Sequence, residues 1–137
     1  MGISCHLSFD GECAVAFRRY QRILGGEFTT LLTYGESPLA RQVPREWQSR
    51  ILHATLMVDD QELLGSDAFP GTYVKLQGFS VTLHVPVPEA ARVFVSLSEG
   101  GSIRMPFEPT FWSPGFGMLV DRYGIPWEIN GERVHRA

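Results

Sequence analysis

The stretch FGMLVDRYGIPWEIN, residues Phe116–Asn130, decides the fold. Two apolar runs within it, Gly117–Asp121 and Ile125–Asn130, flank the turn-forming residues Asp-Arg-Tyr-Gly and predict a tight hairpin. The second run carries one acidic residue, Glu128, whose apolar neighbours would occupy the core face of the strand. Because burying an unpaired carboxylate is costly, Glu128 should face solvent, a partner, or a polar cavity or metal site.

Length and composition describe one soluble globular domain over residues 1–137. A hydrophobic content of 44% against 20% charged residues argues against disorder. The net charge of −3 without a basic face argues against nucleic acid as a partner. No leader-like or membrane-length apolar run is visible, so we expect no membrane partner and a cytoplasmic location. Cys5 and Cys13 are then expected to be free thiols.

The first half of the chain predicts a strand, a helix and three further strands. Residues Ile3–Phe9 alternate apolar and polar side chains, as a half-buried strand does. A helical spacing of apolar residues follows over Cys13–Leu24, with Asp10 as the expected N-terminal cap and Gly25-Gly26 as the stop. Further strands are predicted at Glu27–Tyr34, Ile51–Val58 and Gln61–Asp67. This is a βαβββ module over about residues 1–68.

The same pattern starts again after a linker at Ala68–Gln77. Its predicted elements are a strand at Phe79–Val85, a helix from Pro88, a strand at Ser102–Phe107, a loop at Pro109–Gly115 and the hairpin quoted above. The chain therefore contains an internal repeat of roughly 65–75 residues, and the second module covers about residues 78–132.

Seven short motifs occur in a specific order along the chain. They are Leu7–Gly11 (LSFDG), Ala16-Phe17 with Tyr20 before Gly25-Gly26, His53–Leu56 (HATL), Gly65–Asp67 (GSD), Gly78–Ser80 (GFS), Glu108 to Trp112 followed by Phe116–Met118 (FGM), and Gly124–Asn130 (GIPWEIN). With these motifs the chain resembles the PhnB-like branch of the vicinal oxygen chelate superfamily, which includes glyoxalase I, extradiol dioxygenases and fosfomycin-resistance proteins. The resemblance implies an α+β fold in which two βαβββ modules form a cup-shaped mixed sheet with helices on the outer face. It also implies a homodimer.

In the metal-dependent members of this superfamily, each module supplies ligands from its first and last strands. Superposing ISCHLSF on FSVTLHV places Ser4 and Ser80 at the two first-strand positions, where hydroxyls are poor ligands for a divalent metal. On the last strands, Glu128 matches the C-terminal glutamate of the glyoxalases, and Ser66 or Asp67 is its counterpart in the first module. If a divalent metal is bound, Glu128 and Asp67 are the carboxylates expected to hold it.

Other side chains are expected to line the cup rather than to bind metal. His6 and His84 are single imidazoles on the polar faces of their strands. Trp112 and Phe116 can form an apolar pocket wall. The segment Gly35–Arg50 is either a lid over the cup or a surface insertion.

The sequence thus predicts a PhnB-like protein that binds a small molecule in the cup without a complete metal site. The expected ligand-binding residues are Ser4, His6, Asp67, Ser80, His84, Trp112, Phe116 and Glu128. The alternative is a lyase, isomerase or dioxygenase in which a divalent metal acts as a Lewis acid on a substrate with vicinal oxygens. Whether the protein is an enzyme stays open at this point.

Overall fold

The structure, a computed structural model, describes residues 1–133. It divides into two compact units, Met1–Val74 and Lys75–Ala137, and the division falls inside the segment Ala68–Gln77. In the described part of the chain, neither helix is long and apolar enough to cross a membrane.

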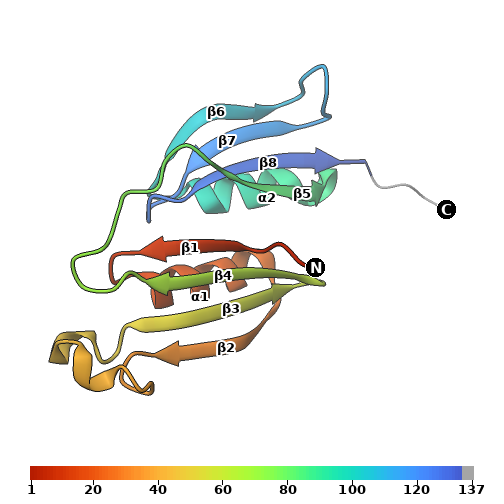
Figure 1. Cartoon of the computed structure of the whole chain (residues 1–137). Helices are drawn as coiled ribbons and strands as arrows, with labels where there is room; N and C mark the ends of the chain where they lie inside the picture. The colour runs from red at the N-terminus through yellow and green to blue at the C-terminus, as the bar shows by residue number, and fades with distance from the viewer. Residues whose placement is uncertain (134–137) are drawn as a thin grey trace. The chain divides into compact units, whose positions relative to one another are not determined.

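The first unit contains one helix and a four-stranded mixed sheet (Figure 1). Its elements are β1 (Cys5–Phe9), α1 (Cys13–Leu24), β2 (Glu27–Thr33), β3 (Ile51–Val58) and β4 (Gln61–Asp67). The strand order is β1-β4-β3-β2, in which β1 runs parallel to β4 and the other neighbours are antiparallel. Two short 3-10 helices, η1 (Ala40–Gln42) and η2 (Arg45–Trp47), interrupt the connection from β2 to β3.

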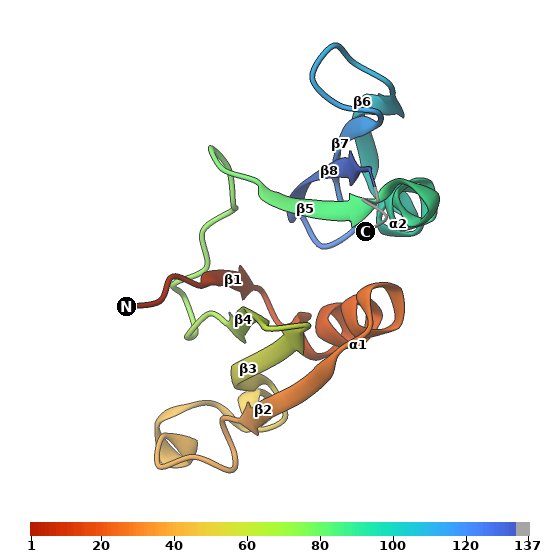
Figure 2. The same cartoon turned by 90° about the vertical axis from the view of Figure 1, so that its right-hand side faces the viewer.

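The second unit repeats this topology with β5 (Val81–Pro86), α2 (Val87–Ser98), β6 (Ser102–Glu108), β7 (Phe116–Val120) and β8 (Pro126–Glu132). Its order is β5-β8-β7-β6, again with one parallel pair, β5 with β8. In Figure 2 each helix lies on one side of its own sheet. The predicted α+β fold of two βαβββ modules is therefore confirmed. The cup between the sheets stays a prediction.

One close approach between helix and sheet recurs in both units. In the first, an added Cβ at Gly65 would lie 2.3 Å from Cε2 of Phe17 in α1. In the second, an added Cβ at Gly117 would lie 2.6 Å from Cε2 of Phe94 in α2. Each glycine thus lets an aromatic ring sit directly on the sheet, and the buried apolar residues of both helices gather at this contact.

This packing divides the side chains of every strand between two faces, because successive residues point to opposite sides. We call the side away from the unit's own helix the open face. In β8, for example, Trp127 and Ile129 are buried, whereas Glu128 and Asn130 are half-buried on the open face.

Several predicted boundaries are wrong by one or two residues. The strands β1 and β5 each begin two residues later than predicted, so Ser4 and Ser80 directly precede them. The helix α2 begins at Val87, one residue before Pro88, because the extended backbone at Pro86 leads straight into it. The strand β8 continues two residues past Asn130, which adds Glu132 to the open face.

The predicted cap of α1 is also wrong. The residue before the helix is Glu12, and its side chain makes no capping hydrogen bond. Instead, Asp67 at the end of β4 accepts a hydrogen bond from the Cys13 amide (3.0 Å) and a second from the Ile51 amide (2.8 Å). One carboxylate, with a 1% exposed side chain, therefore satisfies backbone donors at the start of both α1 and β3.

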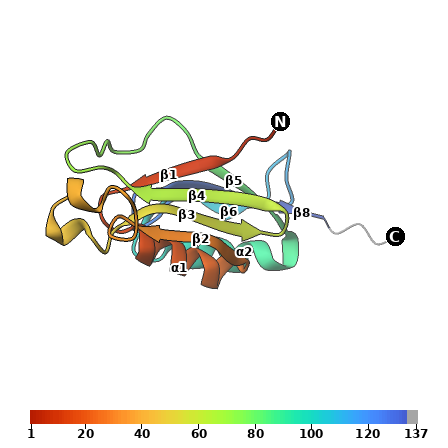
Figure 3. The same ribbon diagram turned by 60° about the horizontal axis from the view of Figure 1, so that its bottom comes forward.

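The segment Gly35–Arg50 is an ordered insertion at one end of the sheet (Figure 3). It has a small core of its own, in which Tyr34, Val43 and Trp47 are buried. The Arg50 guanidinium lies 4.0 Å from the centre of the Trp47 ring, and the Tyr34 hydroxyl donates to the Asp67 carbonyl at 2.8 Å. These contacts favour a packed surface insertion over a lid.

We predict that Asp67→Ala lowers the free energy of unfolding by roughly 2–4 kcal/mol, because two buried amides lose their acceptor. Urea unfolding of the variant and the wild type measures this difference. Asp60→Ala, at an exposed position in the turn between β3 and β4, is the matched control and should change stability little. Equal stability of Asp67→Ala and the control would contradict the capping role.

Candidate functional site

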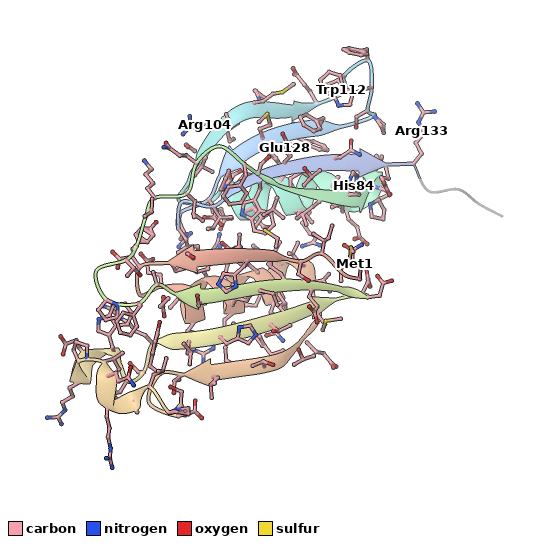
Figure 4. All side chains as sticks on the ribbon, viewed as in Figure 1. Met1, His84, Arg104, Trp112, Glu128 and Arg133 are labelled. Atoms are coloured by element: carbon pink, nitrogen blue, oxygen red, sulfur yellow. The ribbon has the colours of Figure 1, made fainter. Side chains whose placement is uncertain are left out.

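Glu128 lies on the open face of the second unit, next to a hydroxyl donor. The parallel pairing of β5 with β8 sets Thr82 directly beside Glu128. The Thr82 hydroxyl donates to Oε2 of Glu128 at 2.8 Å. The carboxylate is therefore paired and half-buried, and it stays available on the open face, where Figure 4 labels it.

The next row of the same face contains a second polar cluster. His84 pairs in register with Asn130, and its Nδ1 lies 3.1 Å from Nδ2 of Asn130 and 3.5 Å from Oε1 of Glu132. A neutral Nδ1 accepts from the amide of Asn130, whereas a protonated ring forms an ion pair with the carboxylate of Glu132. The imidazole therefore has a suitable partner in either protonation state.

Aromatic side chains border this cluster at the loop between β6 and β7, where Figure 4 labels Trp112. The ring of Trp112 lies edge-on to Phe116 with centroids 5.4 Å apart, and edge-on to Phe111 at 4.7 Å. The loop is tied to β8, since the Gly131 amide donates to the Gly115 carbonyl at 2.7 Å. The aromatic group is therefore held beside the end of β8.

A pocket of about 370 Å³, open to solvent, lies between the loop and the strand. It is lined by Trp112, Pro114, Asn130, Gly131, Glu132 and Arg133. One wall is thus aromatic and the other is polar, so a bound molecule could combine ring stacking with hydrogen bonds. Glu128 lies two residues before Asn130 on the same face and is not part of the lining.

The turn that precedes β8 is fixed by a second buried carboxylate, Asp121. Its Oδ2 accepts from the indole nitrogen of Trp127 at 2.9 Å, and its Oδ1 accepts from the amide of Ile125 at 3.0 Å. Because Trp127 is held on the core face, the residues on either side of it, Glu128 included, must point to the open face.

The open face of the first unit is different in kind. His6 lies with its Nε2 2.9 Å from the Ser66 hydroxyl, and Ser4 donates to Oε2 of Glu62 at 3.2 Å. Burial lowers the pKa of His6, and the nearby charge of His53 lowers it further. His6 is thus mainly a neutral imidazole near neutral pH.

Asp67 does not join the other candidate residues. It belongs to the helix-side face of β4, and both of its oxygens are used by backbone amides. The strand register also identifies the counterpart of Glu128. His6 and Thr82 are equivalent in the two modules, and they pair with Leu64 and Glu128 respectively. The counterpart of Glu128 is therefore Leu64, and the predicted counterparts Ser66 and Asp67 are wrong.

The side chains at the expected metal-ligand positions fit a divalent metal poorly. They are two serine hydroxyls, one leucine and a single carboxylate, and a divalent metal needs several imidazole, thiolate or carboxylate ligands. Within residues 1–133, no three His, Cys, Asp or Glu side chains come together as such a site requires. The two thiols are free, and burial raises the pKa of both Cys5 and Cys13, which keeps them protonated and unreactive.

Sequence reasoning missed Asn130, Glu132 and Arg133, and it also missed the pairing of Glu128 with Thr82. Residues Glu128, Asn130 and Glu132 follow the two-residue period of a strand, so a longer predicted strand would have placed them on one face. Of the predicted residues, Trp112 lines the pocket, whereas His84 contacts its lining residue Asn130 and Phe116 contacts Trp112. Ser80 lies just before β5, outside the strands.

Comparison with known proteins gives both close and distant relatives. No family model matches the chain. The protein YjdN of Escherichia coli strain K12 is 36% identical over 139 aligned residues, which cover 95% of each chain. The crystal structure of protein PA1353 from Pseudomonas aeruginosa has a TM-score of 0.89 at 40% identity and covers 98% of this chain and 99% of that one.

Two further solved structures share the fold. One, described as a putative 3-demethylubiquinone-9 3-methyltransferase, PhnB protein, from Bacillus cereus, has a TM-score of 0.80 at 24% identity over 96% of this chain and 100% of that one. The fosfomycin resistance protein FosX from Listeria monocytogenes has a TM-score of 0.62 at 10% identity over 97% and 94%. These similarities show that the chain belongs to the family of YjdN, and that it shares its fold with the PhnB protein and with FosX.

Proposed function

We propose that the chain binds a small, planar organic molecule on the open face of its second module, in the pocket beside Trp112. The observation that carries this proposal is the pairing of an aromatic wall with a polar wall across one pocket of about 370 Å³. A pocket of this size suits a one- or two-ring ligand.

The lining residues indicate the chemistry of the ligand. Trp112 offers an exposed indole on which a ring can stack. Asn130 both donates and accepts hydrogen bonds, Glu132 accepts them, and Arg133 donates to an anionic or carbonyl oxygen. The ligand should therefore carry at least one hydrogen-bond donor and one oxygen acceptor on its ring.

Glu128 extends the site along the strand. It lies on the same face two residues from Asn130, and its carboxylate already accepts from Thr82. A ligand long enough to leave the pocket along β8 can donate a hydrogen bond to this carboxylate. Glu128 thus contributes to recognition of longer ligands rather than to the pocket itself.

Binding without a catalytic metal is part of the proposal. Among the positions at which the superfamily places its metal-binding residues, only Glu128 is a strong metal ligand. Leu64 occupies the position where a second carboxylate would be needed. The alternative function, a metal-dependent lyase, isomerase or dioxygenase, requires a donor set that this chain does not supply in the residues described. We also propose the homodimer and the cytoplasmic location expected from the sequence.

We predict that ring-bearing acids and amides shield the fluorescence of Trp112 from acrylamide. Among the three tryptophans, Trp112 is 53% exposed, whereas Trp47 and Trp127 are 8% and 1% exposed, so the quenchable signal reports on the pocket. A fragment found in this way should bind about tenfold more weakly to Asn130→Ala, which loses a polar contact, and to Glu132→Gln, which replaces a charged acceptor by a neutral one.

Glu89→Gln on the exposed side of α2 is the matched control for these variants and should keep wild-type affinity. If no fragment shields Trp112, or if the pocket variants bind as tightly as the control, the proposed site is wrong.

We also predict that protein purified without chelator or affinity tag contains much less than one equivalent of zinc, nickel, manganese or iron. Elemental analysis by mass spectrometry measures the metal content, and thermal unfolding with added divalent ions measures weaker binding. One equivalent of metal in the wild type that is lost in Glu128→Ala would refute metal-free binding and support the enzyme alternative.

A further inference from the structure

The open face of the first module carries a cluster of imidazoles and hydroxyls that the proposed function does not use. We call it the imidazole cluster, and its members are His6, Ser8, His53, Thr55 and Ser66. They come from three neighbouring strands, β1, β4 and β3. Two histidines on one sheet face, each next to a hydroxyl, are a candidate binding site.

The strand register brings these side chains together around Ser66. Ser8 pairs with Ser66 across β1 and β4, and Ala54 pairs with Gly65 across β3 and β4, so His53 lies beside Ser66 on the open face. On the other side, Nε2 of His6 lies 2.9 Å from the Ser66 hydroxyl. Ser66 is therefore flanked by both imidazoles.

The second histidine has its own hydroxyl partner. Nε2 of His53 lies 3.3 Å from Oγ1 of Thr55, whose side chain is 5% exposed. Imidazoles and hydroxyls can all present hydrogen-bond donors toward the same point above the sheet. An oxygen-rich group there could accept from several of them at once.

No carboxylate of the first module lies within the imidazole cluster. Asp67, the neighbour of Ser66, points to the helix side and is used by the amides of Cys13 and Ile51. Glu62 is four residues back along β4, where it accepts from Ser4, and Glu27 is on β2 opposite Met57. The centre of this face is thus free of the module's own negative charge, in contrast to the second module, where Glu128 and Glu132 lie on the open face.

We propose that the imidazole cluster binds an oxyanion group of the phosphate or sulfate type. The hydroxyls of Ser8 and Ser66 and the ring N–H groups of His6 and His53 donate to its oxygens. The imidazole cluster belongs to the first module and the pocket beside Trp112 to the second, and this proposal does not depend on the function proposed for that pocket.

The charge balance of the cluster follows from the same contacts. Burial lowers the pKa of His6, and the nearby charge of His53 lowers it further. A bound dianion reverses this effect, because it favours the protonated form of both rings. Binding should therefore raise the pKa of both histidines, and affinity for an anion of constant charge should increase as the pH falls.

Ring NMR titrations of the full chain in chloride and in sulfate at equal ionic strength test this proposal. Sulfate keeps its charge over the pH range used, so we expect the pKa of His6 and His53 to rise by about one unit while that of His84, in the other module, stays unchanged. Sulfate affinity should be about tenfold higher at pH 5.5 than at pH 7.5, and His6→Gln and His53→Gln should each remove most of this gain.

Parallel titrations with inorganic phosphate and methyl phosphate distinguish the free ion from a phosphoryl group on an organic molecule, and either result supports the oxyanion site. Ser66→Ala, a smaller change than the histidine substitutions, should weaken sulfate binding without loss of the folded state. If His6 and His53 respond to sulfate no more than His84 does, the oxyanion site is refuted. That result would not refute the function proposed for the second module, because the fluorescence of Trp112 tests that function separately.

Discussion

The contact between one aromatic ring and one glycine in each module determines where every other side chain of the sheet can lie. Phe17 on Gly65 and Phe94 on Gly117 hold each helix directly against its sheet. Because strand residues alternate between two faces, this packing buries Trp127 and Ile129 and leaves Glu128 and Asn130 on the open face. A shift of one residue in β8 would bury both polar side chains, so the fold itself fixes the polar character of the candidate site.

Much of this arrangement could be predicted from the sequence, because period-two alternation and helical spacing are local signals. The helix Cys13–Leu24 and the strands Ile51–Val58 and Gln61–Asp67 have the bounds that the pattern predicts. The capping role of Asp67 could not be predicted, since it depends on the end of β4 meeting the start of α1 across 54 residues of sequence. The same limit applies to the pocket, which needs the loop at Pro114 to lie beside Arg133.

The two modules have diverged more in chemistry than in topology. Equivalent register positions hold Leu64 in one and Glu128 in the other. The first open face groups two imidazoles with hydroxyls, whereas the second combines one imidazole with carboxylates and an amide. A repeat that keeps its backbone while the side chains of its two open faces differ suits recognition of different chemical groups. It does not preserve the matched ligand set that a shared metal would need.

The central claim is that a small molecule binds to the second module between the loop at Trp112 and the strand β8, without a metal. The most direct test is an amide NMR spectrum recorded in the presence of chelator while a ring-bearing acid or amide is added. The account predicts chemical-shift changes concentrated in residues 112–116 and 128–133, with smaller changes at His84. Shift changes that appear only after a divalent metal is added, or that avoid these two segments, would contradict it.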